Sequence, residues 1–417
     1  MPEESALHEV SDIVDAPNDR AVRTLISEWR AADLITSEQA DALTAYHREH
    51  HLDEERSRGF GRTIAVVSSL GALLVGAGIL LVVSSNWQSF TPLAKTAMAM
   101  VAVVAIEAIG YAIRFGTGYH RTGEAILFVG VAAYGGAIFL VAQTYNRPVD
   151  DPNLFLFWLL AILPLAYVVR SRLIMALSIV VTYGVIGYRL ADWTEGTSSE
   201  VLAVATTYLV VGAATVSIGG VHRDVRALRY MAPPWEWLGT ASIVVMLFVS
   251  SFRDIYDWSD RGWIEDVSGS LQALLVAAAF LTGAGIVART AIRKRFDREV
   301  ALTASITGLA MIASAVLIGA PFSDSVISFA VMNLILLAMV TTLVVGGVAT
   351  GRQSLVNIAL VVFAVAVVAR YIEIGAGMLG TGAAMIVGGA LLIGLGVGLE
   401  RFRRTLVARM RQGERMA

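Results

Sequence analysis

The chain has 417 residues, of which 56% are hydrophobic and only 16% charged, and its mean hydropathy is +0.67. Soluble domains carry about 25% charged residues, so this composition excludes an ordinary soluble protein and predicts that most of the chain lies in a lipid bilayer. The absence of cysteine excludes disulfides and cysteine-based metal sites. The net charge of −2 does not indicate a partner, and we expect no nucleic acid and no cofactor.

A polar segment precedes the apolar part of the chain. Residues 1–18 are acidic and are predicted to be a disordered tail. Residues 19–58 are predicted to form a small cytoplasmic helical hairpin, because apolar residues recur at helical spacing on both sides of a capping box. In this box Thr36 is the N-cap and Gln39 is the third helical residue.

The core of this hairpin would contain only a few side chains, too few for a stable domain. We therefore expect residues 19–56 to bind a protein partner or to associate with a second copy. Its second helix carries His47, His50 and His51, a spacing that could place two imidazoles on one metal ion. The alternative is a solvated helical face. We favour this alternative and predict no metal site, because no third ligand is nearby.

The first apolar run, residues 63–83, contains no charge. At ~1.5 Å per helical residue it is long enough to cross the ~30 Å hydrocarbon layer. Three arginines precede the run, and Asn86 and Trp87 follow it. Basic residues mark the cytoplasmic side and tryptophan favours the interface, so this span is predicted to run from the cytoplasm outward.

Further apolar runs give a total of about twelve predicted transmembrane helices. They lie near residues 63–83, 94–113, 124–144, 154–169, 173–189, 201–218, 237–252, 269–288, 300–320, 325–348, 355–370 and 376–399. With the N-terminus inside, 22 basic residues of the inner loops, the approach to the first span and the C-terminal tail fall on the inner side, and six fall on the outer side. This asymmetry predicts a multi-pass protein of the cell (cytoplasmic) membrane with both termini, including the basic tail 401–417, in the cytoplasm.

The membrane region divides into predicted halves of six helices, residues 59–218 and 219–400. The first and seventh spans share Leu-Gly, at residues 70–71 and 238–239, and Val-Ser-Ser near their ends, at residues 83–85 and 249–251, and short basic turns close two corresponding hairpins. Six spans per half would give a parallel repeat about an axis along the membrane normal. Chance similarity between apolar segments is the alternative.

The longest predicted outer loop, residues 253–266, is acidic and contains Trp258 and Trp263. It could bind a cation or a basic peptide. We favour the simpler interpretation of a loop poor in cations whose tryptophans lie at the membrane interface.

Charges inside a span are costly and are functional candidates by default. Glu107, in the second span, is predicted to lie about two turns from the inner face. Tyr111 is a nearby hydrogen-bond donor, and Arg114 is on the same helical face and could reach back to the carboxylate. A proton-coupling role and a neutral, hydrogen-bonded structural acid both stay open.

Polar and aromatic residues occur at the predicted outer ends of three spans. Asn86 and Trp87 end the first, Gln143 and Tyr145 end the third, and Trp158 lies about one turn into the fourth. An unpaired amide near the hydrocarbon edge is costly, so these groups must pair with each other, with water or with a ligand. One interpretation is an outward-facing ligand pocket with tryptophan walls; the other is ordinary capping of helix ends.

The order of these motifs resembles a known family. The motifs are WRAADLITSEQADAL in the hairpin, SSNW after the first span, AQTYN at the end of the third span and LFLFWLLAILPLAYVVRSR over the fourth. They are similar to the bacterial predicted-membrane-protein family catalogued as domain of unknown function 2157, over about Val22 to Gly187. The resemblance implies a multi-pass membrane protein and supplies no activity. The family positions that it carries over are Asn86, Trp87, Gln143, Tyr145 and Trp158. Ala142 stands where many members have glycine.

Two classes of function stay open. The first is a transporter-like protein with a polar site open to the outer side. The second is a sensory or interaction protein that signals through its cytoplasmic hairpin. An enzyme is not predicted, because no cluster of residues suits metal hydrolysis or nucleophilic catalysis.

Overall fold

The computed structural model describes residues 26, 28–32, 34–45, 85, 87–117, 119–148, 151–195, 199–257, 263–319, 325–378 and 394. The chain divides into two compact units, Met1–Thr91 and Pro92–Ala417. The described residues are helical or in turns and include no strand, which confirms the predicted all-α class.

The first unit contains the predicted capping box. The Thr36 N–H donates to Oε1 of Gln39 at 2.9 Å, and the Gln39 N–H donates to Oγ1 of Thr36 at 3.2 Å. This reciprocal pair satisfies two N–H groups at the start of the helical residues 37–45. Residues 28–31 are also helical, and a short 3-10 helix η1 (Trp87–Ser89) lies at the end of the unit. The rest of the predicted hairpin lies outside the described residues.

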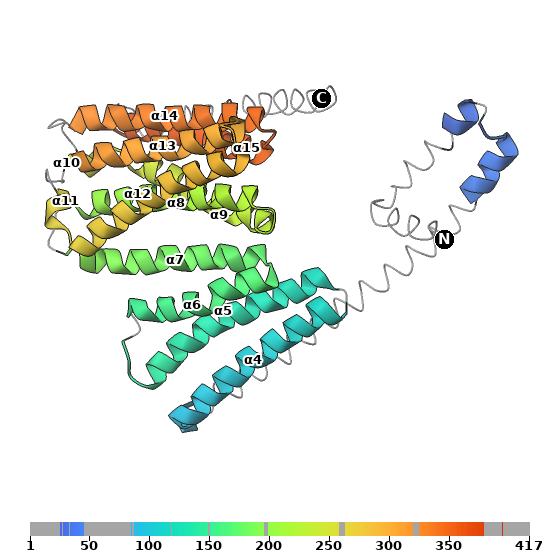
Figure 1. Ribbon diagram of the computed structural model, residues 1–417, viewed down its shortest axis with the longest axis horizontal. Helices are drawn as coiled ribbons and strands as arrows, with labels where there is room; N and C mark the ends of the chain where they lie inside the picture. Colours follow the sequence, from blue (N-terminus) through green and yellow to red (C-terminus); the bar gives the residue numbers. More distant parts are fainter. Residues whose placement is uncertain are drawn as a thin grey trace. The chain divides into compact units, whose positions relative to one another are not determined.

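Helices make up the second unit (Figure 1). Within its described part, ten helices are long and apolar enough to cross a membrane. The elements are α4 (Pro92–Gly116), α5 (His120–Thr144), α6 (Pro152–Val169), α7 (Arg172–Trp193), α8 (Glu200–Asp224), η2 (Arg229–Met231), α9 (Ala232–Val249), α10 (Asp254–Asp257), α11 (Trp263–Asp266), α12 (Gly269–Arg293), α13 (Arg298–Gly319), α14 (Ser325–Ala349) and α15 (Gln353–Met378).

The ten long helices coincide with the second to eleventh predicted spans. The first predicted span and most of the twelfth, 376–399, lie outside the described residues, so the total of twelve stays a prediction. One boundary is wrong: α15 continues through residues 371–375, where the sequence predicts a loop. Glu373 pairs with Arg370 one helical turn earlier, which accommodates its charge without ending the helix.

Helix α8 lies at the centre of the main core. In the most apolar 18-residue stretch of α8, 78% of the residues are buried, whereas the corresponding share for α4 is 6%. Helix α8 packs against α9, α12 and α13. A Cβ added to Gly239 of α9 would lie 2.8 Å from the Gly212 carbonyl oxygen of α8, closer than real Cβ atoms come. Glycine at both positions therefore lets the two backbones touch.

The packing of α8 crosses the predicted boundary at residues 218/219, because its partners belong to the predicted second half. The α6–α7 and α14–α15 hairpins do share a turn geometry. The Ser171 N–H donates to the Ala166 carbonyl, and the Arg352 N–H donates to the Gly347 carbonyl at the equivalent place. The six-plus-six repeat stays a prediction.

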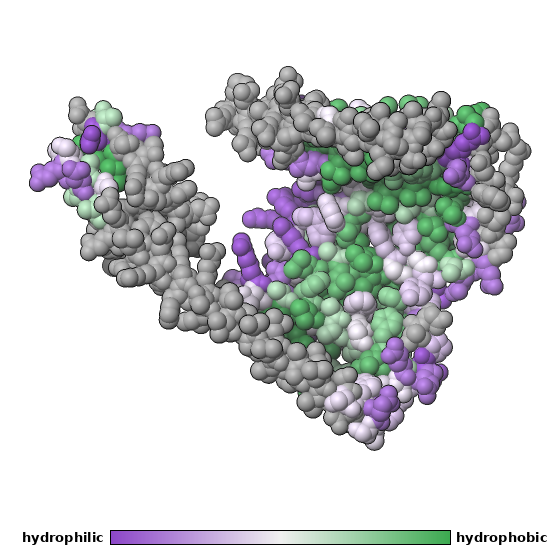
Figure 2. Space-filling model, turned by 180° about the vertical axis from the view of Figure 1, so that it is seen from behind, coloured by the Kyte–Doolittle hydropathy of each residue, from purple (hydrophilic) through white to green (hydrophobic). Residues whose placement is uncertain are grey.

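Polar residues of the second unit gather toward the helix ends. Figure 2 shows hydrophobic side chains over the middle of the helices and hydrophilic ones toward both ends. We call one of these the basic end; it contains the turns 117–119, 170–171, 225–231, 294–297 and 350–352. The described residues that follow α5, α7 and α9 lie at the opposite end, as expected for helices that alternate in direction.

The position of Trp263 differs from the interfacial one that the sequence predicts. Its side chain is fully buried in the core around α8, and its Nε1 donates to the Leu317 carbonyl at 3.0 Å. Leu317 is in the last turn of α13, where carbonyls have no partner within the helix. The indole N–H is thus paired, which makes burial of the ring favourable. Trp258 lies outside the described residues.

Candidate functional site

A buried ion cluster lies at the basic end. Asp224, the last residue of α8, accepts a hydrogen bond from Arg289 Nε at 2.7 Å and pairs with Arg293 Nη2 at 2.6 Å. The side chains of Arg289 and Asp224 are 0% and 1% exposed. Both arginines are on α12, one turn apart, so they flank a single carboxylate. We call Asp224, Arg289, Arg293 and Asp297 the Asp224 cluster; it joins α8 to α12.

Asp297 caps the next helix. Its Oδ1 accepts the Val300 N–H at 3.1 Å, and its Oδ2 lies 2.5 Å from Arg293 Nη1. Burial acts to raise the pKa of Asp297, but the hydrogen bonds from Val300 and Arg293 outweigh it and hold that pKa below its ordinary value. The carboxylate is therefore charged at neutral pH and links α12 to α13.

A second cluster surrounds Glu236, in the second turn of α9. Arg223 donates from Nε to Glu236 Oε1 at 2.6 Å and from Nη2 to Oε2. Arg352 Nη1 lies 3.2 Å from the same Oε2, and Arg352 Nη2 pairs with Glu299. Burial lowers the pKa of Arg352, although the Glu236 carboxylate acts in the opposite direction. This Glu236 cluster connects α8, α9, α13 and the turn before α15.

Neither cluster is predicted from the sequence. The arginines at the basic end read as loop charges, and the acids among them carry no predicted role: Asp224, Glu236, Asp297 and Glu299. These acids lie at or near the predicted inner ends of helices, a pattern that was available in the sequence. The pairing was not available, because Glu236 and Arg352 are 116 residues apart in the chain.

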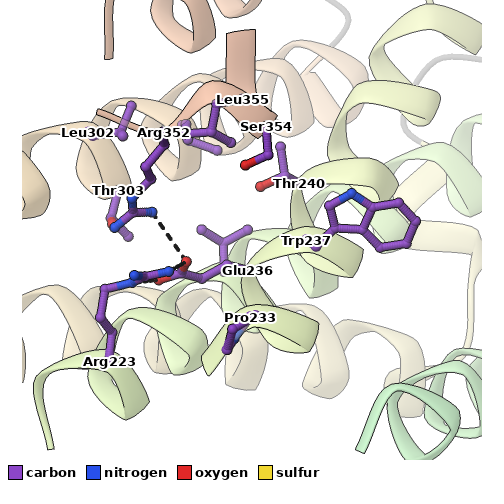
Figure 3. A pocket seen from close by; sticks show the side chains of 12 residues that line it. Arg223, Pro233, Glu236, Trp237, Thr240, Leu302, Thr303, Arg352, Ser354 and Leu355 are labelled. Carbon is purple, nitrogen blue, oxygen red and sulfur yellow. Dashed lines mark hydrogen bonds and ion pairs between the residues drawn. The ribbon is translucent and has the colours of Figure 1, made fainter. Parts of the chain in front are cut away.

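A cavity of about 110 Å³ opens beside the Glu236 cluster (Figure 3). Its lining residues are Arg223, Glu236, Arg352, Thr240, Thr303, Ser354, Val216, Pro233, Trp237, Leu302, Ile306 and Leu355. They come from α8, α9, α13 and the α14–α15 turn with the start of α15. The cavity therefore combines a charged rim, three hydroxyl groups and an apolar wall at one end of the membrane helices.

The environment of Glu107 differs from the one predicted. Its carboxylate lies against α5 at Gly130, where an added Cβ would be 2.5 Å from Oε1. Arg114 does not reach back to it: Arg114 Nη2 donates to the Val169 carbonyl at 2.9 Å, and Nη1 lies 3.8 Å from Glu124. The last carbonyls of α6 lack helical partners and so attract this guanidinium. Glu107 has no hydrogen bond or ion pair with the described residues, so both roles stay open.

Gln143 and Tyr145 lie together at the exposed end of α5. Trp158 is not beside them. Its Nε1 donates to the Val131 carbonyl at 3.0 Å, and its ring covers Gly135. Val131 is about 18 Å along the helix from Gln143 at ~1.5 Å per residue. The gap left by glycine accepts the indole ring, so Trp158 fastens α6 to the middle of α5.

The remaining candidates are not placed beside Gln143. Asn86 and the histidines His47, His50 and His51 lie outside the described residues, and Trp87 belongs to the first unit. A shared outward-facing pocket therefore stays a prediction. Within the described ranges, no group of three or more His, Asp or Glu side chains could hold a metal ion.

At the opposite end of the bundle, Arg370 of α15 binds the turn after α9. Its Nη2 donates to the carbonyl oxygen and to Oγ of Ser251, both at 2.5 Å. Its guanidinium carbon lies 4.6 Å from the Phe252 ring centroid and 5.1 Å from that of Phe329 in α14. The sequence suggests a loop charge here, whereas the structure makes Arg370 a link between α15, α14 and the end of α9.

In the part of the chain that the structure describes, ten apolar helices with charged groups gathered near their ends define a polytopic α-helical membrane protein. Residues 27–175 match the family model described as "Predicted membrane protein (DUF2157)", which confirms the resemblance. The match ends near the start of α7, so the ion clusters and the cavity lie beyond it. No curated protein and no solved structure matches the chain.

Proposed function

We propose that the protein is transporter-like and that its polar cavity is bounded by ion pairs that open and close. The observation that carries this proposal is the position of the cavity beside the partly exposed Glu236 cluster. In transporters, alternating access moves helix groups against each other around a fixed site. Such a site needs boundary contacts that can break at low cost.

The two ion clusters differ in how easily they could open. Removing one partner of a fully buried pair, such as Arg289–Asp224, costs about 3–5 kcal/mol. A solvent-exposed pair contributes only about 0–1 kcal/mol, because water and salt screen it. The side chains of Arg223, Glu236 and Arg352 are 31%, 15% and 18% exposed and lie between these limits. The Glu236 cluster is therefore the part that can open, while the Asp224 cluster keeps α8 and α12 together.

Two arginines fasten α15 to the two ends of α9 in a way that suits alternating access. Arg352 lies in the turn just before α15, and Arg370 lies 18 positions later, within the helix. Their separation of about 27 Å approaches the thickness of the hydrocarbon layer. Arg352 binds Glu236 near the start of α9, and Arg370 binds Ser251 just after its end. Release of one of these two contacts at a time would expose the polar groups between α9 and α15 to one membrane face.

The polar site open to the outer side stays part of the proposal. Asn86, Trp87, Gln143 and Tyr145 would supply ligand access from outside, and Trp158 is left out because it packs within the helices. The basic end would then face the cytoplasm. Reporter fusions after Arg172 and after Arg404 should read cytoplasmic, and a fusion within residues 257–263 should read external. One reversed reading would contradict this orientation.

Cysteine labelling tests whether the cavity opens. Because the chain has no cysteine, Thr240→Cys can be followed without background. In inside-out vesicles we expect slow labelling by a membrane-impermeant maleimide, and several-fold faster labelling when Glu236→Gln is added. Glu200→Gln, which neutralises an exposed carboxylate at the other end of α8, is the control and should change nothing. Equal rates with and without Glu236→Gln would contradict the opening of this cluster.

A sensory or interaction role is the second candidate. In the first unit Trp29, Leu34 and Leu43 are 43%, 71% and 41% exposed, and exposed apolar side chains of this kind suit a protein partner or a second copy. Proteolysis of inside-out vesicles should cut within residues 56–62 and release a hairpin while the spans stay intact. Protection of that stretch would mean that the hairpin is docked rigidly.

A further inference from the structure

The rim of the cavity carries more positive than negative charge. Arg223 and Arg352 line it together with one carboxylate, Glu236. An arginine has five N–H donors. Arg223 gives Nε and Nη2 to Glu236, and Arg352 gives one N–H each to Glu236 and Glu299. Donors therefore remain on both guanidinium groups after their ion pairs with the described residues are counted.

The hydroxyl of Thr240 provides a second, independent observation. The residue is only 2% exposed, yet its hydroxyl makes no hydrogen bond within the described part of the chain. Most other buried threonines of these helices donate to the carbonyl four residues earlier, as Thr215 and Thr282 do. In Figure 3 the Thr240 hydroxyl points into the cavity toward the Ser354 hydroxyl. A buried polar group without a partner is unfavourable unless a ligand or water completes its bonding.

The donors surround the cavity on several sides. Arg223 comes from α8 and Thr240 from α9. Arg352 comes from the turn before α15, and Ser354 from the first turn of that helix. A planar carboxylate would be satisfied by one guanidinium fork, whereas a tetrahedral oxyanion accepts hydrogen bonds from several directions. The apolar wall of Val216, Leu302, Ile306 and Leu355 keeps water away and strengthens the attraction to an anion. We propose that this cavity binds a phosphate group.

Two sources could supply that group. One is the headgroup of an anionic lipid, because the cavity lies at a helix end where headgroups occur and basic pockets between helices bind them. The other is free phosphate or a small phosphorylated solute. The phosphate site is the same cavity as in the proposed function. Binding of phosphate does not depend on that function, but the consequence of binding rests on it.

Thermal unfolding of the purified full-length protein in detergent micelles tests the binding. Inorganic phosphate should raise the melting temperature in a saturable way, and acetate at equal ionic strength should not. Thr240→Val keeps the side-chain shape, lies outside the ion pairs and should weaken phosphate binding by about tenfold. Thr341→Val, at an exposed threonine of α14, is the matched control and should leave the affinity unchanged. Arg352→Gln should abolish the shift, and Arg295→Gln, at a side chain 76% exposed, should not.

Short-chain phosphatidylglycerol added in competition distinguishes the sources. If the lipid competes with inorganic phosphate, the site also binds lipid headgroups. If it does not compete, the site binds free phosphate. Both results support a phosphate site. The proposal is overturned if neither ligand shifts the melting temperature or if Thr240→Val binds as tightly as the unchanged protein. If phosphate binds but Glu236→Gln leaves the labelling of Thr240→Cys unchanged, the site stands and the transporter-like function fails. If phosphate does not bind but Glu236→Gln speeds the labelling of Thr240→Cys, only the phosphate site is overturned.

Discussion

Helices α4 and α8 are almost equally apolar and equally long, but they lie in opposite environments. Only 6% of the most apolar window of α4 is buried, whereas 78% of that of α8 is. Lipid tails are as apolar as leucine, so hydropathy alone does not distinguish a helix that faces lipid from one that faces other helices. The difference is found in other residues.

The residues that distinguish α8 are small or carry a hydroxyl group. Gly212 touches the α9 backbone, Ser217 donates to the Thr282 carbonyl of α12, and the Thr215 hydroxyl oxygen accepts a hydrogen bond from the Tyr183 hydroxyl. Helix α4 also approaches a neighbour closely, at Gly110 against Leu127 and at Arg114 against Gly123, but in the described residues its main packing partner is α5 alone. Close approach and hydrogen bonds to several helices thus mark the centre of this membrane protein.

The largest expected difference between the two regions concerns their ion pairs. Asp224→Ala leaves Arg289 buried without its carboxylate and should destabilise the protein by about 3–5 kcal/mol. Glu124→Ala removes a looser pair, 3.8 Å from Arg114, and the 2.6 Å hydrogen bond from Ser171, so it should cost less, about 1–3 kcal/mol. Thermal unfolding in detergent measures both variants. Similar losses would show that the α4–α5 region is held as strongly as the core.

Glycine substitutions sharpen the comparison. Gly239→Leu would force α8 and α9 apart and should cost about 1–3 kcal/mol. Gly136→Leu in α5 is the matched control: an added Cβ there meets nothing within 4 Å, so a change below about 0.5 kcal/mol is expected. Equal melting temperatures for the two variants would mean that α8 and α9 do not depend on this contact.

Asp297 gives the core region a dependence on pH. Because its pKa is lowered on folding, it contributes stability above its unfolded pKa, and that stability is lost as pH falls through the folded pKa. Asp297→Asn can keep the cap to Val300 but loses the charge, so it should destabilise the protein by on the order of 1 kcal/mol at pH 7 and less at pH about 3. Exposed Asp254→Asn is the control. A constant difference between pH 3 and 7 would rule out this linkage.

The smallest effect on stability is expected at the exposed end of α5. Gln143→Ala should change the free energy of unfolding by less than about 0.5 kcal/mol, because the side chain is exposed. If the predicted outward-facing site is correct, the same variant should still impair ligand access, measured as external labelling of a nearby Tyr145→Cys with and without ligand. A clear fall in melting temperature would instead identify Gln143 as a helix-end cap.

The family match and the packing centre cover different parts of the chain. Residues 27–175 carry the recognisable motifs, including the capping box and Trp158. The ion clusters and the cavity follow later, between Asp224 and Arg352. Resemblance therefore predicted the class of protein and drew attention to α5 and α6, away from the region where the structure gathers its charged groups.

Local properties were readable from the sequence alone. Span length follows from the thickness of the bilayer, and the Thr36–Gln39 box needs only residues three positions apart, so both were predicted correctly. The central place of α8, the buried indole of Trp263 and the pairing of Glu236 with Arg352 depend on contacts between distant parts of the chain. Tertiary structure decided these features, because in a membrane every helix is apolar and only the packing of small and polar side chains selects which helices meet.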